Sequence, residues 1–306
     1  MTTLSRHSLP TYAALAAGIE QLVGNPSVSV PPRLVQKLAG ASSLFVMPAS
    51  NERIAITKLI TYVADNATRG LPTIQGDIVV FDVKNGKRLA ILDGPTITAR
   101  RTAAVSLLAA QKLAKQKEGP LLIVGAGVQG LAHLEAFHEG LGVTAFGIAS
   151  RNSGSVERLV THAQKLGLRA WAVDDANAAL ADYPLIVSTT SAQQVALHAL
   201  PHPDAFIAAV GAFTPAMVEW APEVCRHIHN TGTIVVDSRD ADHEAGDLLQ
   251  ACLDVAALPT LGDVVTHSPR WTHLPRKPGP VFFKSCGWAG WDLAAADCMV
   301  SHTMQP

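Results

Sequence analysis

The sequence predicts an α/β protein in which a doubly wound parallel sheet follows a mainly antiparallel one. Between about residues 118 and 265, short apolar strands alternate with helix-like stretches, a pattern typical of βαβ units in a parallel sheet. Between residues 1 and 95, segments rich in Ile, Val and Phe are separated by turn residues, which favours antiparallel strands. The 306 residues are enough for one large or two ordinary domains.

The first zone begins with a predicted helix and continues with predicted strands. YAALAAGIEQLV, residues 12–23, has the periodicity of a helix. Asn85-Gly86 is a dipeptide that a tight turn with positive φ prefers, so FDVKNGKRLAILD predicts a hairpin. The expected strands lie in ASSLFVMPA, IAITKLITYVAD, GDIVVFDV and KRLAILDG.

A long helix is predicted for residues 96–117, where Ala and Leu recur at helical spacing and the C-terminal end is basic. Thr98 is the expected N-cap, which would place Arg100 and Arg101 in the first turn. After about Arg276, VFFKSCGWAGWDLAAADCMVSH predicts a strand and a helix that return to the first zone.

PLLIVGAGVQG, residues 120–130, contains the pattern G-x-G-x-x-G. The pattern alone is also found in plain strand-to-helix turns, but here a buried strand precedes it and a helix follows. That context predicts a Rossmann-type loop that binds the pyrophosphate of a dinucleotide at the helix N-terminus. The candidate cofactor-binding residues are Gly125, Ala126, Gly127, Val128, Gln129 and Gly130.

The residues about 20 positions beyond the last glycine indicate which dinucleotide is bound. Ser150, Arg151 and Asn152 stand there, and none of them is a carboxylate that would pair with a ribose 2′-hydroxyl. A hydroxyl, a guanidinium and an amide suit a 2′-phosphate, so the sequence favours NADPH over NADH. The competing interpretation is that Arg151 only solvates the start of a helix.

Two basic positions are the candidates for substrate chemistry. Arg101, or by composition Arg100, would face the cleft between domains and could hold a carboxylate with two parallel hydrogen bonds. Lys58 lies within an apolar strand on the same face as Ile56 and Ile60. It is either an edge-strand lysine with a buried stem, or a lysine that touches substrate or donates a proton.

Composition argues against several other classes of protein. The 24 Lys and Arg residues against 25 Asp and Glu leave no basic excess to attract nucleic acid or an anionic membrane. MTTLSRHSLP lacks the apolar core of a signal peptide, and no run of about 18 apolar residues occurs. The four cysteines have no metal-like spacing, and CRHIH lacks a second half. We therefore expect a cytoplasmic protein with no metal site.

Five segments occur in an order that resembles the ornithine cyclodeaminase/mu-crystallin family over nearly the whole chain. They are FVMPA, ITKLITYVADNATRGLPTIQG, LAILDGPTITARRTAA, GAGVQG and VFFKSCGWAGWDLAAA. The resemblance implies a homodimer whose substrate-binding and dimerisation domain is split between residues 1–105 and 280–306. Residues 106–279 would form the Rossmann domain.

The resemblance also assigns roles to residues. Lys58 matches the family's active-site lysine and Arg101 its carboxylate-binding arginine, while Arg33 falls near a further substrate-binding arginine. Other matched positions line the substrate cleft or lie beside the cofactor: Thr73 and Gln75 for the cleft, and Thr189, Thr190, Val210 and Gly211 for the cofactor.

One departure from the family pattern bears on the reaction. Cyclodeaminases have an aspartate after the strand that ends in AVG, and this chain has Phe213, which cannot accept a proton. The resemblance therefore implies a reductase that converts Δ1-pyrroline-2-carboxylate to L-proline and Δ1-piperideine-2-carboxylate to L-pipecolate, with Phe213 as an apolar wall. The alternatives are alanine dehydrogenase, ornithine cyclodeaminase, hydroxyproline dehydratase and a non-catalytic, crystallin-like binding protein.

Overall fold

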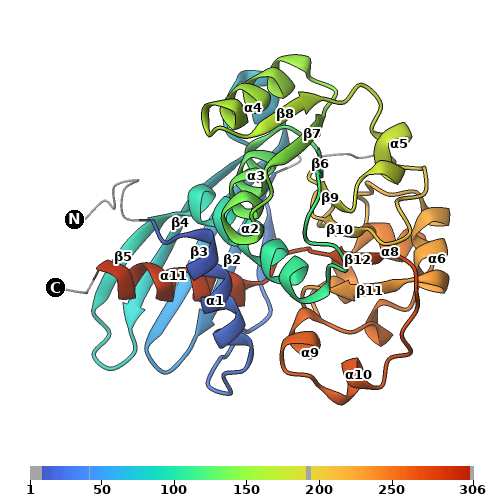
Figure 1. Cartoon of the computed structure of the whole chain (residues 1–306). Coiled ribbons are helices and arrows are strands. Elements are labelled where there is room, and N and C mark those ends of the chain that lie inside the picture. Colours follow the sequence, from blue (N-terminus) through green and yellow to red (C-terminus); the bar gives the residue numbers. More distant parts are fainter. Residues whose placement is uncertain (1–8, 41, 191–193, 304–306) are drawn as a thin grey trace. The chain divides into compact units, whose positions relative to one another are not determined.

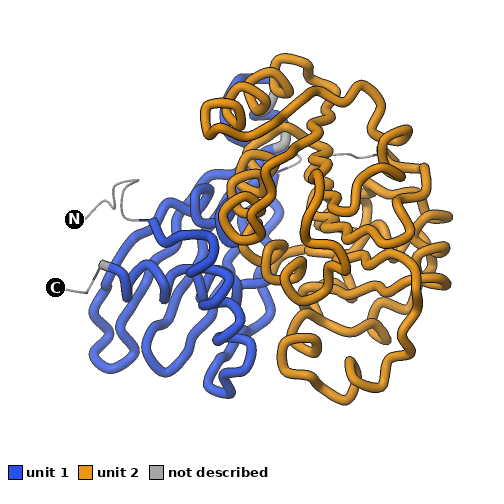
Figure 2. The backbone as a smooth tube through the Cα atoms, in the orientation of Figure 1, with its two compact units in different colours: residues 1–102, 288–306 blue, residues 103–287 orange. Residues whose placement is uncertain are grey.

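The computed structural model describes residues 9–40, 42–190 and 194–303. The N-terminal segment in which we expected no signal peptide lies mostly outside these residues. The chain forms two compact units (Figure 2): unit 1 contains residues 1–102 and 288–306, and unit 2 contains residues 103–287. One unit has an antiparallel sheet and the other a parallel sheet, so the predicted α/β class is confirmed.

Unit 1 is built on a five-stranded antiparallel sheet with the order β1-β2-β3-β4-β5. The predicted hairpin joins β4 and β5, and Gly86 has the left-handed φ of 72° that the Asn-Gly turn requires. The strands are β1 (Leu34–Lys37), β2 (Ser42–Ser50), β3 (Ile54–Val63), β4 (Ile74–Asp82) and β5 (Arg88–Asp93).

Two helices from opposite ends of the chain cover one face of this sheet (Figure 1). They are α1 (Tyr12–Val23) and α11 (Ala289–Thr303), and α11 packs against α1, β2, β3 and β5. Ile19, Ile56, Ile78 and Val80 are buried between these layers. The predicted return of the tail to the first zone is thus seen in α11. A 3-10 helix, η2 (Ala64–Arg69), connects β3 to β4.

Helix α2 (Gly94–Leu113) begins two residues before the predicted start, and the expectation that Thr98 caps it is wrong. The carboxylate of Asp93 accepts a hydrogen bond from Thr96 N at 2.8 Å. The Thr98 hydroxyl donates to Gly94 O inside the helix. Both residue types favour N-caps, and here the earlier one is used. Arg100 and Arg101 consequently lie beyond the first turn, outside the strongest effect of the helix dipole.

Unit 2 is built on a seven-stranded parallel sheet with the order β11-β12-β10-β9-β6-β7-β8. Its strands are β6 (Leu121–Val124), β7 (Ala145–Ala149), β8 (Arg169–Ala172), β9 (Leu185–Ser188), β10 (Phe206–Ala209), β11 (Thr233–Val236) and β12 (Val281–Lys284). Strand β12 pairs with β10 and β11, although the expected boundary at residue 280 assigned it to the other domain. The chain passes from unit 2 to unit 1 after Gly287.

Helices pack on both sides of the parallel sheet, as a doubly wound fold requires. Trp220 meets Phe282 edge to face, with ring centroids 5.7 Å apart, in the core beneath α6 and α8. The longer helices are α3 (Val128–Leu141), α4 (Ser153–Lys165) and α6 (Pro222–Thr231). The shorter ones are α5 (Ala176–Ala179), η3 (Leu180–Asp182), α7 (Ala241–Glu244), α8 (Gly246–Gln250), η4 (Val255–Ala257), α9 (Leu261–Val265) and α10 (Pro269–Thr272). Across the described ranges, every helix is too short or too polar to span a bilayer.

Candidate active site

Lys58 lies on β3, the central strand of the antiparallel sheet. Alternation along the strand places its side chain on the buried face with Ile56 and Ile60, and only 1% of the residue is exposed. The edge-strand interpretation is therefore wrong. An ammonium group on a covered, apolar sheet face requires a partner of opposite charge.

That partner is Asp292, on α11. Its Oδ1 lies 3.1 Å from Lys58 Nζ and 3.2 Å from Arg101 Nε, and its side chain is 0% exposed. One carboxylate oxygen thus connects a β3 lysine with an α2 arginine. We did not predict Asp292 from the sequence. The available signal was a single carboxylate in the otherwise apolar stretch GWAGWDLAAA.

The cluster carries more positive than negative charge. Burial lowers the pKa of Lys58 to about 8; Asp292 opposes this decrease, whereas Arg101 and Arg33 add to it. Two buried cations, Lys58 and Arg101, thus share the carboxylate of Asp292. Oδ2 of Asp292 is buried and has no hydrogen-bond partner among the residues that the structure describes. The excess positive charge of the cluster suits an added anionic ligand, such as the carboxylate of a small acid, whereas the unpartnered Oδ2 would accept a hydrogen bond from a donor.

The structure separates the two neighbouring arginines that the sequence left as alternatives. Arg100 lies over the Tyr12 ring, with its guanidinium carbon 4.1 Å from the ring centroid, and donates a hydrogen bond to Pro10 O. Arg101 is buried and bonds Asp292. Arg101 is therefore the member of the pair that belongs to the Lys58 cluster.

The other substrate-binding residues predicted in unit 1 are Arg33, Thr73 and Gln75, and they differ in their position relative to the Lys58 cluster. Arg33 is half-buried at the start of β1, near enough for its charge to depress the Lys58 pKa. Thr73 is half-buried just before β4, where its carbonyl accepts a hydrogen bond from Val63 N. Gln75 is exposed on β4, where burial alternates, so it lies on the face opposite buried Ile78, the register partner of Lys58. Within unit 1, Arg33 approaches the cluster and Gln75 does not.

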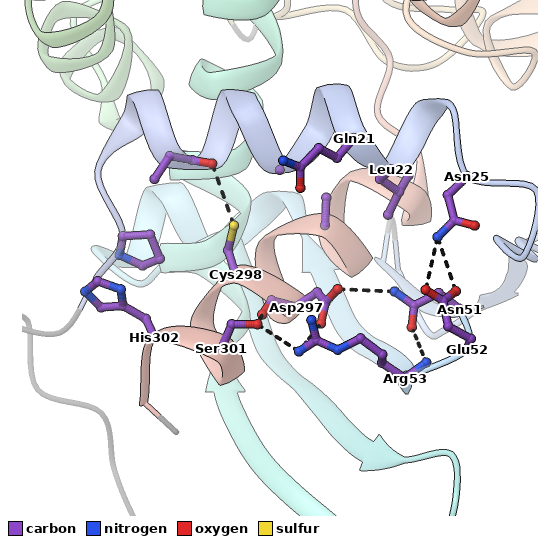
Figure 3. Close-up of a pocket in the computed structure, with 14 residues that line it drawn as sticks. Gln21, Leu22, Asn25, Asn51, Glu52, Arg53, Asp297, Cys298, Ser301 and His302 are labelled. Atoms are coloured by element: carbon purple, nitrogen blue, oxygen red, sulfur yellow. Dashed lines mark hydrogen bonds and ion pairs between the residues drawn. The ribbon is translucent and has the colours of Figure 1, made fainter. Parts of the chain in front are cut away.

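Unit 1 also has a hollow of about 410 Å³ between α1, α11 and the β2–β3 turn (Figure 3). Glu52 accepts hydrogen bonds from Asn25 there, and Arg53 pairs with Asp297 at 3.2 Å. None of the predicted site residues is among its described lining. It is therefore separate from the Lys58 cluster.

The glycine loop of unit 2 has the geometry of a phosphate-binding turn. Gly125 follows β6 with φ of 115°, a conformation that side chains disfavour. Gly127 is the N-cap of α3, has no side-chain cap, and would have no atom within 4 Å of an added Cβ. An added Cβ at Gly130 would collide with Gly125 O. The loop, which also contains Ala126, thus leaves open space at Gly127, before the 14-residue helix that begins with Val128 and Gln129.

Ser150, Arg151 and Asn152 follow the end of β7, and all three are exposed. Asn152 caps α4, because its Oδ1 accepts a hydrogen bond from Ser155 N at 2.9 Å. The side-chain oxygen of Asn152 is therefore engaged in the helix cap. The Ser150 hydroxyl and the Arg151 guanidinium remain at the surface of this corner.

The remaining cofactor candidates follow β9 and β10, two strands that are neighbours in the sheet. Thr189 donates from its hydroxyl to Gly125 O at 2.9 Å, which connects the β9 end to the glycine loop. Val210 N donates to Ser188 O at 2.9 Å, and Thr190 and Gly211 follow these strands. Phe213 is half-buried in the loop after β10. Ser191, the last residue of the STTS segment, lies outside the described residues.

Comparison with known proteins identifies the family to which this geometry belongs. The family model of the ornithine cyclodeaminase/mu-crystallin family matches residues 8–304. The chain belongs to that family. The resemblance inferred from five sequence segments is therefore confirmed over nearly the whole length of the chain.

Several individual relatives cover most of the chain. Δ1-Pyrroline-2-carboxylate reductase 2 of Burkholderia ambifaria is 31% identical, over 96% of each sequence. The ketimine reductase mu-crystallin of the mouse, Mus musculus, is 34% identical over 83% of this chain and 78% of its own. Residues specific to this chain can thus be compared with reductases of the same family.

Solved structures of other proteins share the fold. The Thermococcus litoralis Δ1-pyrroline-2-carboxylate reductase, solved with NADH and L-proline, has a TM-score of 0.89 at 23% identity and covers 99% of this chain and 98% of its own. An archaeal alanine dehydrogenase dimer with bound NAD has a TM-score of 0.84 at 21% identity, covering 97% and 93%. The combination of a parallel and an antiparallel sheet is thus common to enzymes that act on different substrates.

Proposed function

We propose that this protein is a nicotinamide-dependent reductase of cyclic imino acids, which converts Δ1-pyrroline-2-carboxylate to L-proline and Δ1-piperideine-2-carboxylate to L-pipecolate. The observation that carries the proposal is the buried cluster of Lys58, Arg101 and Asp292 in a chain that also has an open glycine loop. Relatives named as reductases of these imines, at least 31% identical over most of the chain, support it.

The residues of unit 2 fit a dinucleotide. Gly127 leaves the space that a pyrophosphate needs, and the first N–H groups of α3 have no side-chain acceptor at its N-cap. Gly125, Gly130 and Thr189 would shape the loop, while Thr190, Val210 and Gly211 would border the nicotinamide end. When bound, the dinucleotide supplies the hydride that reduces the C=N bond.

We propose NADPH as the preferred dinucleotide. The Ser150 hydroxyl and the Arg151 guanidinium are exposed after β7, and no carboxylate occupies these positions. Arg151 can bind a 2′-phosphate with two hydrogen bonds, whereas a ribose hydroxyl would lack the carboxylate partner that NAD-binding enzymes provide. Asn152 contributes through the α4 cap, which fixes the backbone of this corner.

The cluster in unit 1 would bind the substrate through its carboxylate. Arg101 donates to Asp292 through Nε, so its terminal nitrogens are the groups available for a carboxylate, with Arg33 as a further cation. The substrate carboxylate would balance the second positive charge of the cluster that Lys58, Arg101 and Asp292 form. Fixing it would also fix which face of C2 receives the hydride.

Lys58 would serve as the proton donor to the imine nitrogen. With a pKa of about 8, its ammonium group predominates at neutral pH but gives up its proton more readily than an exposed lysine. The nitrogen gains this proton as the C=N double bond becomes a single bond. Asp292 would hold the lysine in place through the ion pair of 3.1 Å.

Phe213 supports reduction rather than ring-closing deamination, because its aromatic ring cannot accept a proton. We propose that it forms an apolar wall toward the substrate ring. The absence of an aspartate at this position of the sequence is the feature that separates the two reactions here.

We further propose that the protein is a homodimer in the reducing environment of the cytoplasm. The outer face of the antiparallel sheet exposes Leu34, Leu59 and Phe81, between 37% and 56%, which is unusual for a free surface. The archaeal alanine dehydrogenase that shares the fold was solved as a dimer. All four cysteines are free thiols.

A substrate panel tests the proposal. Purified protein is mixed with NADPH or NADH and with a five-membered imine, a six-membered imine, or pyruvate and ammonia, while L-ornithine is supplied separately to detect ammonia release. We expect rapid oxidation of NADPH only with the imines. Turnover with pyruvate and ammonia alone would identify an alanine dehydrogenase, and dinucleotide binding without turnover would identify a binding protein.

A matched pair of variants ties the activity to the cluster. Arg101→Met should lower kcat/KM for the imine by about a hundredfold or more, because it removes a buried, charge-assisted contact. Arg100→Met is the control, since Arg100 packs on Tyr12. Equal losses in the two variants would contradict the assignment.

A further inference from the structure

Glu219 is a buried carboxylate at the ends of two parallel strands. The residue lies between β10 and α6 and is 0% exposed. It lies beside the ends of β9 and β10, the two segments that the proposed function places next to the nicotinamide. A charge in this position needs several hydrogen bonds to be stable.

Both carboxylate oxygens of Glu219 are fully used. Oε1 accepts from Thr190 N at 2.7 Å and from the Thr190 hydroxyl at 2.9 Å. Oε2 accepts from Gly211 N at 2.7 Å and from the Ser188 hydroxyl at 3.1 Å. One side chain therefore joins the second residue after β9, Thr190, to the second residue after β10, Gly211.

The approach at Gly211 is unusually close. A Cβ atom at this glycine would collide with Thr190 O and with the Glu219 carboxylate. Ser188 is fixed as well, because its hydroxyl accepts from Trp220 Nε1 at 3.0 Å. The strand ends are thus packed against the carboxylate with no space for a side chain at Gly211.

A buried ion pair, formed by Asp247 and Lys284, binds the backbone of Glu219. Its backbone N donates to Asp247 Oδ1 at 2.6 Å, and Asp247 Oδ2 lies 2.7 Å from Lys284 Nζ on β12. Burial raises the pKa of Glu219, whereas Lys284 and the donors of Thr190 act against that rise. Lys284 and Asp247 are both 0% exposed, so this ion pair is shielded from solvent.

We propose that Glu219 is a positioning residue, whose carboxylate sets the ends of β9 and β10 that would border the nicotinamide. The inference rests on the proposed function, because it presumes that these ends face a dinucleotide. Thr189 extends the connection, since its hydroxyl bonds Gly125 O in the glycine loop. Glu219 would thereby fix the nicotinamide end of the site relative to the phosphate end.

Glu219→Gln is the informative variant, because it conserves size. Each oxygen of Glu219 receives a backbone N–H, so either orientation of the glutamine amide would point an NH2 group at Thr190 N or at Gly211 N. One strand end would be released. Glu223→Gln, the same substitution on α6, is the matched control, and Ile228→Ala controls for a general loss of stability.

The test combines hydrogen exchange of the ligand-free protein with dinucleotide titration, at a temperature where all variants are folded by circular dichroism. In Glu219→Gln we expect faster exchange at residues 188–190 and 209–212. We also expect about a tenfold or larger rise in the NADPH dissociation constant, as for one buried hydrogen bond lost. Both controls should keep the wild-type dissociation constant.

Unchanged exchange at these residues would overturn the inference, and so would faster exchange with unchanged NADPH affinity and kcat. Wild-type protein that binds neither NADPH nor NADH would refute the proposed function and this inference with it. If the wild type binds NADPH and reduces the imine, and Glu219→Gln does the same with unchanged hydrogen exchange, only the role of Glu219 is refuted.

Discussion

Replacing Asp292 with asparagine removes the one described negative charge from the Lys58 cluster with little change in shape. Lys58 Nζ and Asp292 Oδ1 are 3.1 Å apart, and both groups are buried. At an effective dielectric constant of about 20, such a pair interacts by about 5 kcal/mol. At about 1.4 kcal/mol for each pH unit, this sets an upper limit of about four pH units on the change in the Lys58 pKa.

Reorganisation of nearby polar groups reduces this limit, and an opposite charge at such a distance typically changes a pKa by about one to three pH units. The Lys58 pKa is about 8 in the wild type. In Asp292→Asn we therefore expect it to fall to about 5–7. Because the ammonium form is the proton donor in reduction, kcat/KM should be highest below the pKa and fall as the pH rises through it.

The assay is kcat/KM for Δ1-pyrroline-2-carboxylate with saturating NADPH, from about pH 4.5 to about pH 9.5, roughly the range that brackets both pKa values. The alkaline decrease should begin near pH 8 in the wild type and below pH 7 in the variant. Asp297→Asn is the matched control, because Asp297 lies on the same helix but pairs with the partly exposed Arg53. The comparison of variants cancels the titration of the imine itself.

The same substitution has a measurable effect on stability. Two buried cations lose their partner, which typically costs about 3–5 kcal/mol. Urea unfolding at pH 7 should therefore show a much larger loss for Asp292→Asn than for Asp297→Asn. A folded, active Asp292→Asn enzyme whose alkaline decrease stays near pH 8 would refute the assignment of Lys58 as the titrating proton donor.

Three further predictions concern the dinucleotide and the assembly. Gly127→Ala should keep the wild-type melting temperature, because an added Cβ meets no protein atom. The same variant should raise the NADPH dissociation constant about tenfold or more. Gly130→Ala should instead lower the melting temperature, because an added Cβ would collide with Gly125 O. Arg151→Ala should raise KM for NADPH about tenfold and leave KM for NADH within about twofold, measured by steady-state kinetics; equal changes would contradict a 2′-phosphate contact. Leu59→Lys on the outer sheet face should shift the mass in sedimentation toward that of one chain; an unchanged mass would exclude this face as the dimer interface.

The sequence predicted most of the fold because local patterns and tertiary packing agree. The helix at Tyr12–Val23 and the β4–β5 hairpin follow from apolar periodicity and from Asn85-Gly86. The start of α2 was misplaced because Asp93 and Thr98 are both good N-caps, and propensity alone does not choose between them. The position of β12 depends on pairing with β10 and β11, and a short apolar run contains no information about its neighbours.

The candidate site was predicted in part. Lys58 was recognised as unusual because alternation placed a cation on an apolar face. Asp292 was missed, since its two partners lie 234 and 191 residues away in the sequence. Glu219 was missed for the same reason: its partners, Thr190 and Gly211, come together only through the order of the parallel strands.

The most direct test of the central claim is the yield of L-proline from Δ1-pyrroline-2-carboxylate in the presence of NADPH and purified wild-type protein. The reaction proposed here transfers one hydride from each NADPH to each imine. We therefore expect L-proline to form in equal amounts to the NADPH consumed, and both changes to be about a hundredfold slower or more with Arg101→Met at the same protein concentration. NADPH left unconsumed by the wild type, or consumed without formation of L-proline, would contradict the account.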